Sequence, residues 1–240
     1  MKIAVIMSTG GGREQWLRKS IKSILEQPYD VDIYINFDGC EPILFSEKNV
    51  KEYKTCVKGG LAKALNKMLM KVLQSNIEYD YIARMDDDDI MHPDRFKKQI
   101  EAMENDKGID FCGGMLSVID ENDKITNDNW EYARYNNDGT IIQKFLNGGC
   151  YIAHPTVMFR ASMLYDSLDL WYNPLYKELE DYELWFRLLR LKYRYHLIPE
   201  RLVYYRSHTG QETRRNGEAK AKVVNAVLKH FKDNWNNFLC

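Results

Sequence analysis

The chain has 240 residues, and its 34 lysines and arginines balance 35 aspartates and glutamates. This length suits one large domain with a substantial core, and the balanced charge does not favour nucleic acid as a partner. Its five cysteines are widely spaced, with no C-x-x-C pair, which indicates reduced thiols. The first residues lack a signal-peptide pattern and no apolar run reaches the ~20 residues of a membrane span, so we expect a cytoplasmic protein.

The first half of the sequence alternates between apolar strands and amphipathic helices. The expected elements are a strand at 3–7, a helix at 13–25, a strand at 31–37, a short helix and a strand within 43–57, a helix from 61, a strand at 79–85 and a helix at 94–103. Such alternation implies parallel pairing in a three-layer α/β arrangement. Ligands bind such sheets beyond the carboxyl ends of the strands, where Ser8–Gly12, Asp38-Gly39 and Asp86–Asp89 should converge.

The second half has a different pattern. We expect a strand at 111–119, a hairpin turn at 120–124, an exposed loop at 127–137, a short helix at 140–145, a strand entering a helical turn at 153–160, a helix at 178–191, strands at 193–198 and 202–207, and an amphipathic helix at 218–239. Strands no longer alternate regularly with helices in this half.

The acidic run Asp86–Asp89 is the most informative stretch of the chain. It directly follows a strand of buried type, YIARM. Four adjacent carboxylates repel one another in a partly dehydrated pocket, so a fold tolerates them either fully solvated or neutralised by a cation. Acidic surface runs are common, but the position after a buried strand favours a divalent metal site here.

Several known metal and phosphate motifs do not fit. An EF-hand loop fails at Ile90 and Met91. The D-x-D-x-[TV] motif of haloacid-dehalogenase-type phosphatases is closer, but that motif ends the first strand of its domain, and here three expected strands precede the acids. The glycines of Ser8–Gly12 match neither a P-loop nor a dinucleotide-binding fingerprint, and nucleophile-elbow and H-E-x-x-H patterns are absent.

An ordered series of motifs runs from Ile3 to about Gln211. The motifs are SIKSILEQ, FDG, GGLAKALNKML, IARMDDDDIMHPDRFKKQ, FCGGMLSVID, HPTVMFR, LEDYELWFRLL and LVYYRSHTG. In this order they resemble the family 2 glycosyltransferases, which are inverting enzymes of the GT-A fold. The resemblance implies an α/β protein with a mixed central sheet flanked by helices. It divides residues 1–215 into a Rossmann-like nucleotide-sugar-binding half (1–108) and an acceptor half (109–215), followed by a helical tail (216–240).

The resemblance also assigns a divalent metal, Mn²⁺ or Mg²⁺, to this site. Asp86 and Asp88 match the D-x-D pair that holds the metal, and His208 matches a late histidine that approaches the metal or the diphosphate. Asp89 is the adjoining acid. Of the four aspartates, Asp87 is the one we expect to be dispensable for the metal.

The nucleotide-sugar donor, expected to be a UDP-sugar, occupies the same edge in this resemblance. Its contacts are assigned to Ser8, Thr9, Asp38, Asp86 and Asp87. The sequence departs from the family pattern in two places: Phe37 replaces the first acid of an Asp-Asp-Gly turn, and Ser8-Thr9-Gly10 replaces a Tyr-Asn pair.

Asp181, in Glu180-Asp181, matches the catalytic base of the family. A carboxylate there would remove the proton of the acceptor hydroxyl during attack. The plain alternative is that both acids only cap a helix, because acidic residues are favoured at helix N-termini.

We therefore expect a metal-dependent inverting glycosyltransferase that moves a sugar to a glycan or lipid-linked acceptor in surface polysaccharide or oligosaccharide synthesis. The alternatives are a metal-dependent phosphatase or nucleotidyltransferase, and a non-catalytic sugar- or nucleotide-binding module. The basic, amphipathic tail either docks on the domain or makes a peripheral contact with the inner face of a membrane. The sequence defines no oligomeric state.

Overall fold

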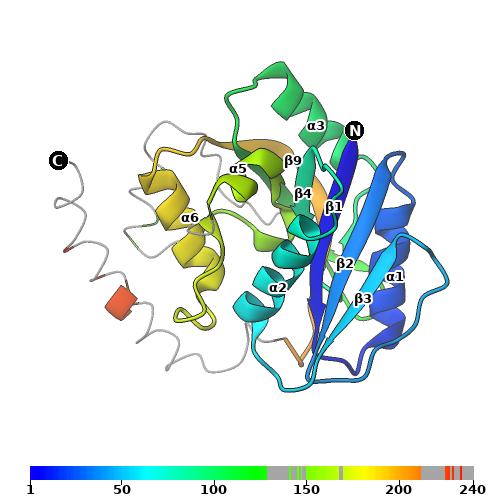
Figure 1. Ribbon diagram of the computed structural model, residues 1–240. Helices are drawn as coiled ribbons and strands as arrows, with labels where there is room; N and C mark the ends of the chain where they lie inside the picture. The colour runs from blue at the N-terminus through cyan, green and yellow to red at the C-terminus, as the bar shows by residue number, and fades with distance from the viewer. Residues whose placement is uncertain are drawn as a thin grey trace.

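The computed structural model describes residues 1–128, 141, 145, 147, 150–167, 170–211, 225–227, 229 and 233. Within these residues the strands are β1 (Lys2–Thr9), β2 (Asp30–Asp38), β3 (Val50–Thr55), β4 (Tyr81–Arg84), β5 (Ile90–Met91), β6 (Phe111–Ile119), β7 (Ile125–Asn127), β8 (Met158–Arg160) and β9 (Tyr195–Arg206). The helices are α1 (Glu14–Leu25), α2 (Leu61–Leu73), α3 (Arg95–Asn105), the 3₁₀ turn η1 (His154–Thr156), α5 (Ala161–Asp166) and α6 (Glu180–Arg190). The described strands form one mixed sheet of order β3-β2-β1-β4-β8-β6-β9-β5, with β7 paired to β6 (Figure 1).

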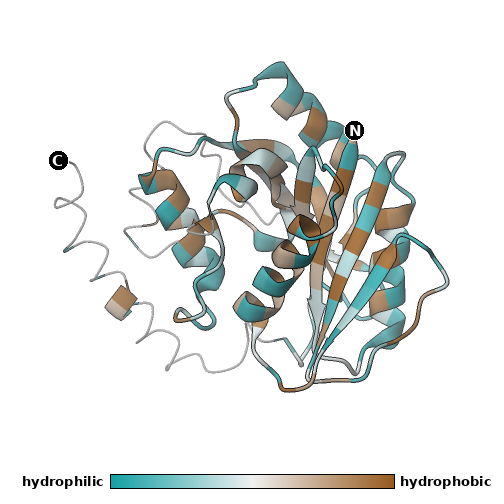
Figure 2. Cartoon of the chain, in the orientation of Figure 1, coloured by the Kyte–Doolittle hydropathy of each residue, from teal (hydrophilic) through white to brown (hydrophobic). Residues whose placement is uncertain are grey.

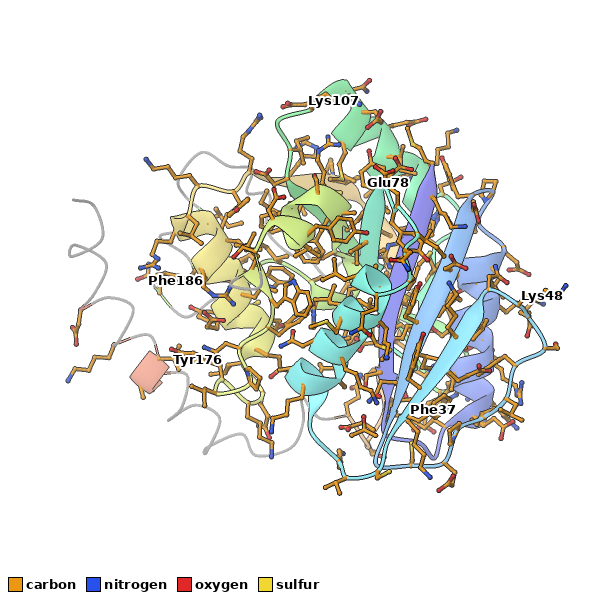
Figure 3. The ribbon with its side chains drawn as sticks, in the orientation of Figure 1. Phe37, Lys48, Glu78, Lys107, Tyr176 and Phe186 are labelled. Carbon is orange, nitrogen blue, oxygen red and sulfur yellow. The ribbon has the colours of Figure 1, made fainter. Side chains whose placement is uncertain are left out.

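The amino-terminal half supplies a parallel sheet whose strand ends meet at one edge. β1 pairs in parallel with β2 and β4, and β2 pairs in parallel with β3. In Figure 3, Phe37 lies at the lower end of β2, whereas Glu78, which precedes β4, lies at the opposite end. The carboxyl ends of these strands therefore share one edge, as the sequence predicted.

Helices cover both faces of the sheet, as expected for three layers. Ile3, Val5 and Met7 of β1 face one core, and the alternate residues Ala4 and Ile6 face the other. Helices α1 and α3 pack on the first face, and α2, α5 and α6 pack on the second (Figure 1). The hydropathy colouring shows the apolar bands along the strands that bury these faces (Figure 2). Period-two alternation in the strands thus builds two cores from one sheet.

The second half extends the same sheet. β8 pairs antiparallel with β4 and with β6, and β9 runs parallel to β6. The hairpin turn predicted at 120–124 is confirmed, because β6 and β7 pair antiparallel on either side of it. The two strands predicted at 193–198 and 202–207 are instead the single strand β9. Its register against β6 shifts around Met115, and the exposed pair Pro199-Glu200 lies at this irregularity.

Two smaller predictions also differ from the structure. Residues 43–49 contain no helix, so the 43–57 region contributes only β3. The 153–160 segment begins with the 3₁₀ turn η1, and only its last residues form the strand that enters α5. The loop expected at 129–137, most of the helix at 140–145 and most of the tail at 216–240 lie outside the described residues. Among the helices that are described, none is both long and apolar enough to cross a membrane.

A buried polar group lies near the opposite, amino-terminal end of the strands. Asp32 accepts a hydrogen bond of 2.6 Å from the Tyr79 hydroxyl, and Lys51 Nζ lies 3.2 Å and Lys2 Nζ 3.5 Å from its carboxylate. Burial alone would raise the pKa of Asp32, but Tyr79 and Lys51 hold it below its ordinary value. This group connects β1, β2 and β3 with the segment before β4 and contains none of the residues of the acidic run.

Candidate active site

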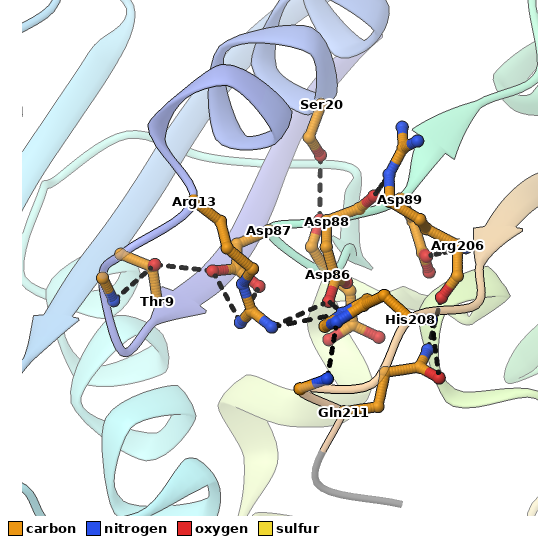
Figure 4. Close-up of polar contacts among 12 residues, drawn as sticks. Thr9, Arg13, Ser20, Asp86, Asp87, Asp88, Asp89, Arg206, His208 and Gln211 are labelled. Atoms are coloured by element: carbon orange, nitrogen blue, oxygen red, sulfur yellow. Dashed lines mark hydrogen bonds and ion pairs between the residues drawn. The ribbon is translucent and has the colours of Figure 1, made fainter. Parts of the chain in front are cut away.

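Asp86–Asp89 form the loop that leaves β4 and enters β5 (Figure 4). Carboxylate oxygens of Asp86, Asp88 and Asp89 all lie within 4.8 Å of one another. Asp88 is 9% exposed and Asp89 is fully buried, and Oδ2 of Asp89 has no hydrogen-bond partner. A buried, unpartnered carboxylate oxygen facing two further carboxylates suits a hard divalent cation such as Mg²⁺ or Mn²⁺. The three acids therefore fit the expected metal.

Two fully buried arginines hold this loop in place. Arg84, the last residue of β4, forms an ion pair with Asp86. Arg206, the last residue of β9, donates from Nε to the carbonyl oxygen of Asp88 (2.7 Å), and its backbone N–H donates to Asp89 Oδ1 (2.8 Å). The loop is thus fixed from both halves of the sheet.

The first loop of the chain is tied to the same acids. Thr9 Oγ1 donates to Asp87 Oδ2 (2.5 Å) and accepts from the backbone N–H of Gly11 (3.1 Å). Arg13 Nη2 lies 3.3 Å from Asp87 Oδ1, and Nη1 lies 3.3 Å from Asp88 Oδ2. Asp87, expected to be dispensable for the metal, therefore connects the acidic loop to the loop after β1.

The acids repel one another in their buried setting. Burial and the adjacent Asp88 raise the pKa of Asp87 to about 6. Burial together with Asp86 raises the pKa of Asp88, and burial together with Asp88 places the pKa of Asp89 well above its ordinary value. A bound cation would reverse these effects by favouring the ionised carboxylates.

His208 lies against this cluster. Its backbone follows β9, and its ring centroid lies 4.8 Å from that of Trp16 in α1. The N–H of Gly210 donates to Nδ1 (3.1 Å), and Nε2 lies 2.9 Å from Asp88 Oδ2 and 3.3 Å from Arg13 Nη1. Nε2 of His208 therefore faces an acid of the cluster that is expected to hold the metal.

Asp38 has a well-defined place at the end of β2. Its carboxylate is 5% exposed, and its two oxygens accept backbone N–H groups of Gly59 (2.8 Å) and Gly60 (2.9 Å) just before α2. Each oxygen keeps a second lone pair for another donor. Ser8 lies half-buried at the end of the neighbouring strand β1, so Ser8, Thr9 and Asp38 share the predicted edge.

The acid assigned as the base lies in the first turn of α6. Asp181 Oδ1 accepts the N–H of Tyr182 (2.7 Å), and the side chain is half-buried. The neighbouring Glu180 is 8% exposed, and burial together with the charge of Asp181 raises its pKa to about 7. The two adjacent acids therefore differ in burial: Glu180 is buried and has a raised pKa, whereas Asp181 is partly exposed.

Tyr172 connects Asp181 with the metal acids. Burial raises the pKa of its hydroxyl, Arg84 opposes this rise, and Asp181, Glu180 and Asp86 add to it. Its hydroxyl also lies 2.8 Å from Nε2 of the buried His154. Charges from both halves of the chain therefore act on this one buried hydroxyl.

Sequence reasoning missed the three arginines of this site. Arg84 carried a signal, since it is the only charged residue in the apolar segment YIARM. Arg13 and Arg206 carried none, because their partners lie 74 and 118 residues away in the chain.

Comparison with known proteins agrees with this fold. The sequence profile described as Glycosyl transferase family 2 matches residues 4–165. An uncharacterized glycosyltransferase of Haemophilus influenzae is 32% identical over 95% of this chain and 85% of its own length. The O-antigen biosynthesis glycosyltransferase WbnJ of Escherichia coli is 32% identical over 99% of this chain and 92% of its own length.

Solved structures show the same architecture. The crystal structure of S. aureus TarS 1–349 in complex with UDP-GlcNAc superposes with a TM-score of 0.63 at 15% identity, over 93% of this chain and 64% of that chain. The corresponding UDP complex gives a TM-score of 0.62 over 95% of this chain and 65% of that chain. At this identity the similarity establishes the GT-A fold, with its mixed sheet flanked by helices.

The chain belongs to glycosyl transferase family 2. Its relatives include enzymes of surface polysaccharide synthesis, namely WbnJ and the amylovoran biosynthesis glycosyltransferase AmsE of Erwinia amylovora, which is 30% identical over 66% of this chain. The prediction of the family and of the GT-A fold is therefore confirmed, and the protein is a glycosyltransferase.

Proposed function

We propose that the protein is a metal-dependent inverting glycosyltransferase that uses a UDP-sugar and a glycan or lipid-linked acceptor of surface polysaccharide synthesis. The observation that carries this proposal is the cluster of Asp86, Asp88 and Asp89 oxygens, all within 4.8 Å of one another, at the end of β4. The UDP and UDP-GlcNAc complexes of TarS support the choice of donor, and the names of WbnJ and AmsE support the class of acceptor.

The donor's diphosphate would lie at the acidic loop. Asp86, Asp88 and Asp89 would hold the metal, which when bound neutralises the charge that develops on the departing nucleoside diphosphate. Ser8, Thr9 and Asp38 would border the nucleoside at the ends of β1 and β2. His208 would keep Asp88 oriented, and the buried arginines Arg84 and Arg206 would keep the loop in place.

Asp181 would act on the acceptor. Its carboxylate receives the proton of the attacking hydroxyl as the new glycosidic bond forms, on the side of the sugar opposite the diphosphate. Attack from that side inverts the anomeric centre. The pKa of Glu180 is raised to about 7, so Glu180 is mostly uncharged below that pH. Asp181 then has no negative charge at the adjacent residue.

The test is a panel of nucleotide-sugars offered with Mn²⁺, in which release of free sugar and thermal stabilisation of the protein are measured together. We expect a UDP-sugar to give both, and a chelator to abolish the release. Asp88→Ala should lose both responses. The exposed Asp94→Ala, six residues further along the chain, should retain them.

Other results would contradict the proposal. Release of inorganic phosphate or pyrophosphate without free sugar would identify a phosphatase or nucleotidyltransferase. Binding without turnover in the presence of any glycan would identify a binding module. Peripheral membrane contact through the tail at 216–240 stays a prediction, which sedimentation with anionic vesicles would test.

A further inference from the structure

Arg13 places a permanent positive charge on the acids that would hold the metal. It lies on the loop between β1 and α1, immediately before the first residue of α1. Its side chain is 27% exposed, and its guanidinium contacts both Asp87 and Asp88 (Figure 4). The donor Nε is buried with no hydrogen-bond partner. The guanidinium is therefore held at the acids by charge, with part of its hydrogen-bonding capacity unused.

The contacts of Arg13 with Asp87 and with Asp88 differ, because only Asp88 is one of the acids expected to bind the metal. Asp87 is outside the group of Asp86, Asp88 and Asp89, and it is anchored separately by Thr9. Asp88 is inside that group, and Arg13 Nη1 lies 3.3 Å from its Oδ2 and 3.3 Å from His208 Nε2, which itself lies 2.9 Å from that oxygen. A cation that binds Asp88 must therefore compete with Arg13, whereas the contact with Asp87 can persist.

The loop that carries Arg13 is open to solvent at Gly12, which is exposed. Gly11 and Gly12 both have positive φ angles, +79° and +82°, which glycine adopts without strain. A Cβ added at Gly12 would meet nothing within 4 Å, so the chain there is not packed against the domain. Arg13 also stands at the N-terminus of the 12-residue helix α1, where the backbone dipole favours an anion.

We propose that Arg13 is an exchangeable counter-ion of the acidic loop: it gives up Asp88 to the divalent metal and, pivoting on Asp87, binds the diphosphate of the donor. This inference rests on the proposed function. Arginine suits the second position because its planar fork binds phosphate oxygens in pairs.

A purely structural Arg13 makes a different prediction from an exchanging one. If Arg13 only stabilised the loop, its removal would weaken the binding of metal and of nucleotide alike. If it exchanges, its removal eliminates a competitor of the metal and a ligand of the diphosphate. The two affinities should then change in opposite directions.

The experiment measures Mn²⁺ binding alone and UDP binding at saturating Mn²⁺, both by calorimetry on the full chain. Arg13→Gln should bind Mn²⁺ about tenfold more tightly and UDP about tenfold more weakly than the parent, as expected for the loss of one charge-assisted contact in each case. Arg13→Lys keeps the charge and should return both affinities toward those of the parent. Arg18→Gln, on the exposed face of α1, should change neither.

The outcomes separate this inference from the proposed function. A parent that binds Mn²⁺ and UDP, combined with an Arg13→Gln variant that binds Mn²⁺ no more tightly, would overturn the exchange and leave the glycosyltransferase proposal intact. A parent that binds neither ligand would overturn the proposed function and the exchange with it. If Arg13→Gln does not fold, Arg13→Met takes its place: tighter Mn²⁺ binding with weaker UDP binding supports the exchange, and a change of both affinities in the same direction contradicts it.

Discussion

Replacing Glu180 by glutamine should make the protein more stable at alkaline pH. The carboxyl is 8% exposed, and burial together with Asp181 raises its pKa from 4.5 to about 7. At pH values below 4.5 the group is protonated in both the folded and the unfolded chain, so its neutral form stabilises the fold fully. As the pH rises toward about 7, the unfolded chain ionises first and this stabilisation is lost. Glutamine cannot ionise and avoids the loss.

The size of the effect follows from the two pKa values. A change from 4.5 to about 7 corresponds to about 3 kcal/mol of unfolding free energy. Urea unfolding of the parent and of Glu180→Gln should therefore give a difference that grows by up to about 3 kcal/mol in favour of the variant between about pH 5 and about pH 8. The growth of the difference is diagnostic, because changes in hydrogen bonding of the amide contribute equally at both pH values.

An exposed glutamate provides the control. Glu121→Gln, in the turn between β6 and β7, should show no such growth. A difference between the parent and Glu180→Gln that is independent of pH would refute the reasoning, since it would mean that Glu180 is ionised in the folded protein at the lower pH.

Three further substitutions test the framework around the site. Arg206→Met removes a fully buried cation that holds the acidic loop, so the free energy of unfolding should fall by about 3 kcal/mol in urea. Asp32→Asn should lower the free energy of unfolding by about 1–3 kcal/mol at neutral pH. The deficit should shrink in acid, because the parent carboxyl becomes protonated as the pH falls through its lowered pKa and then loses the stabilisation that its charge provides. Gly39→Ala would place a Cβ 2.8 Å from a backbone nitrogen of the β3–α2 loop at a φ of +74°, so its melting temperature should fall by several degrees.

Each of these has a matched control in the same part of the chain. Arg201→Met, in the same strand but partly exposed, should change stability by less than about 1 kcal/mol. Asp30→Asn carries an exposed carboxyl and should show no deficit that shrinks in acid. Gly12→Ala has a similar positive φ but open space around it, so it measures the backbone strain without the clash. Equal effects in a variant and its control would contradict the packing described for that position.

Most of the fold was predictable because its elements have clear periodicity. Residues 111–119 alternate and pair as expected, and the helix predicted at 178–191 forms at Glu180–Arg190. The prediction of two strands in place of β9 failed at Pro199, which interrupts an apolar pattern in sequence. In three dimensions the register shift around Met115 absorbs this interruption, so the strand continues.

The site was predictable only in part, and for an electrostatic reason. Carboxylates clustered after a buried strand stand out in sequence, so Asp86 and Asp88 could be singled out, and the family motif pointed to Asp181. The arginines that balance these acids come from the loop after β1, the end of β4 and the end of β9. Which distant cation pairs with which acid depends on the assembled sheet, so no local spacing could have indicated Arg13 or Arg206.

The most direct test of the account is the turnover of Asp181→Asn with the UDP-sugar that the parent uses, measured beside its affinity for UDP. Asparagine has nearly the same shape and cannot accept the proton of the acceptor, so turnover should fall by about 10²–10⁴-fold. The affinity for UDP should stay within about twofold of that of the parent, because the proposed function places the diphosphate at the acidic loop and not at α6. Turnover equal to that of the parent, with UDP still bound, would contradict the account at its centre.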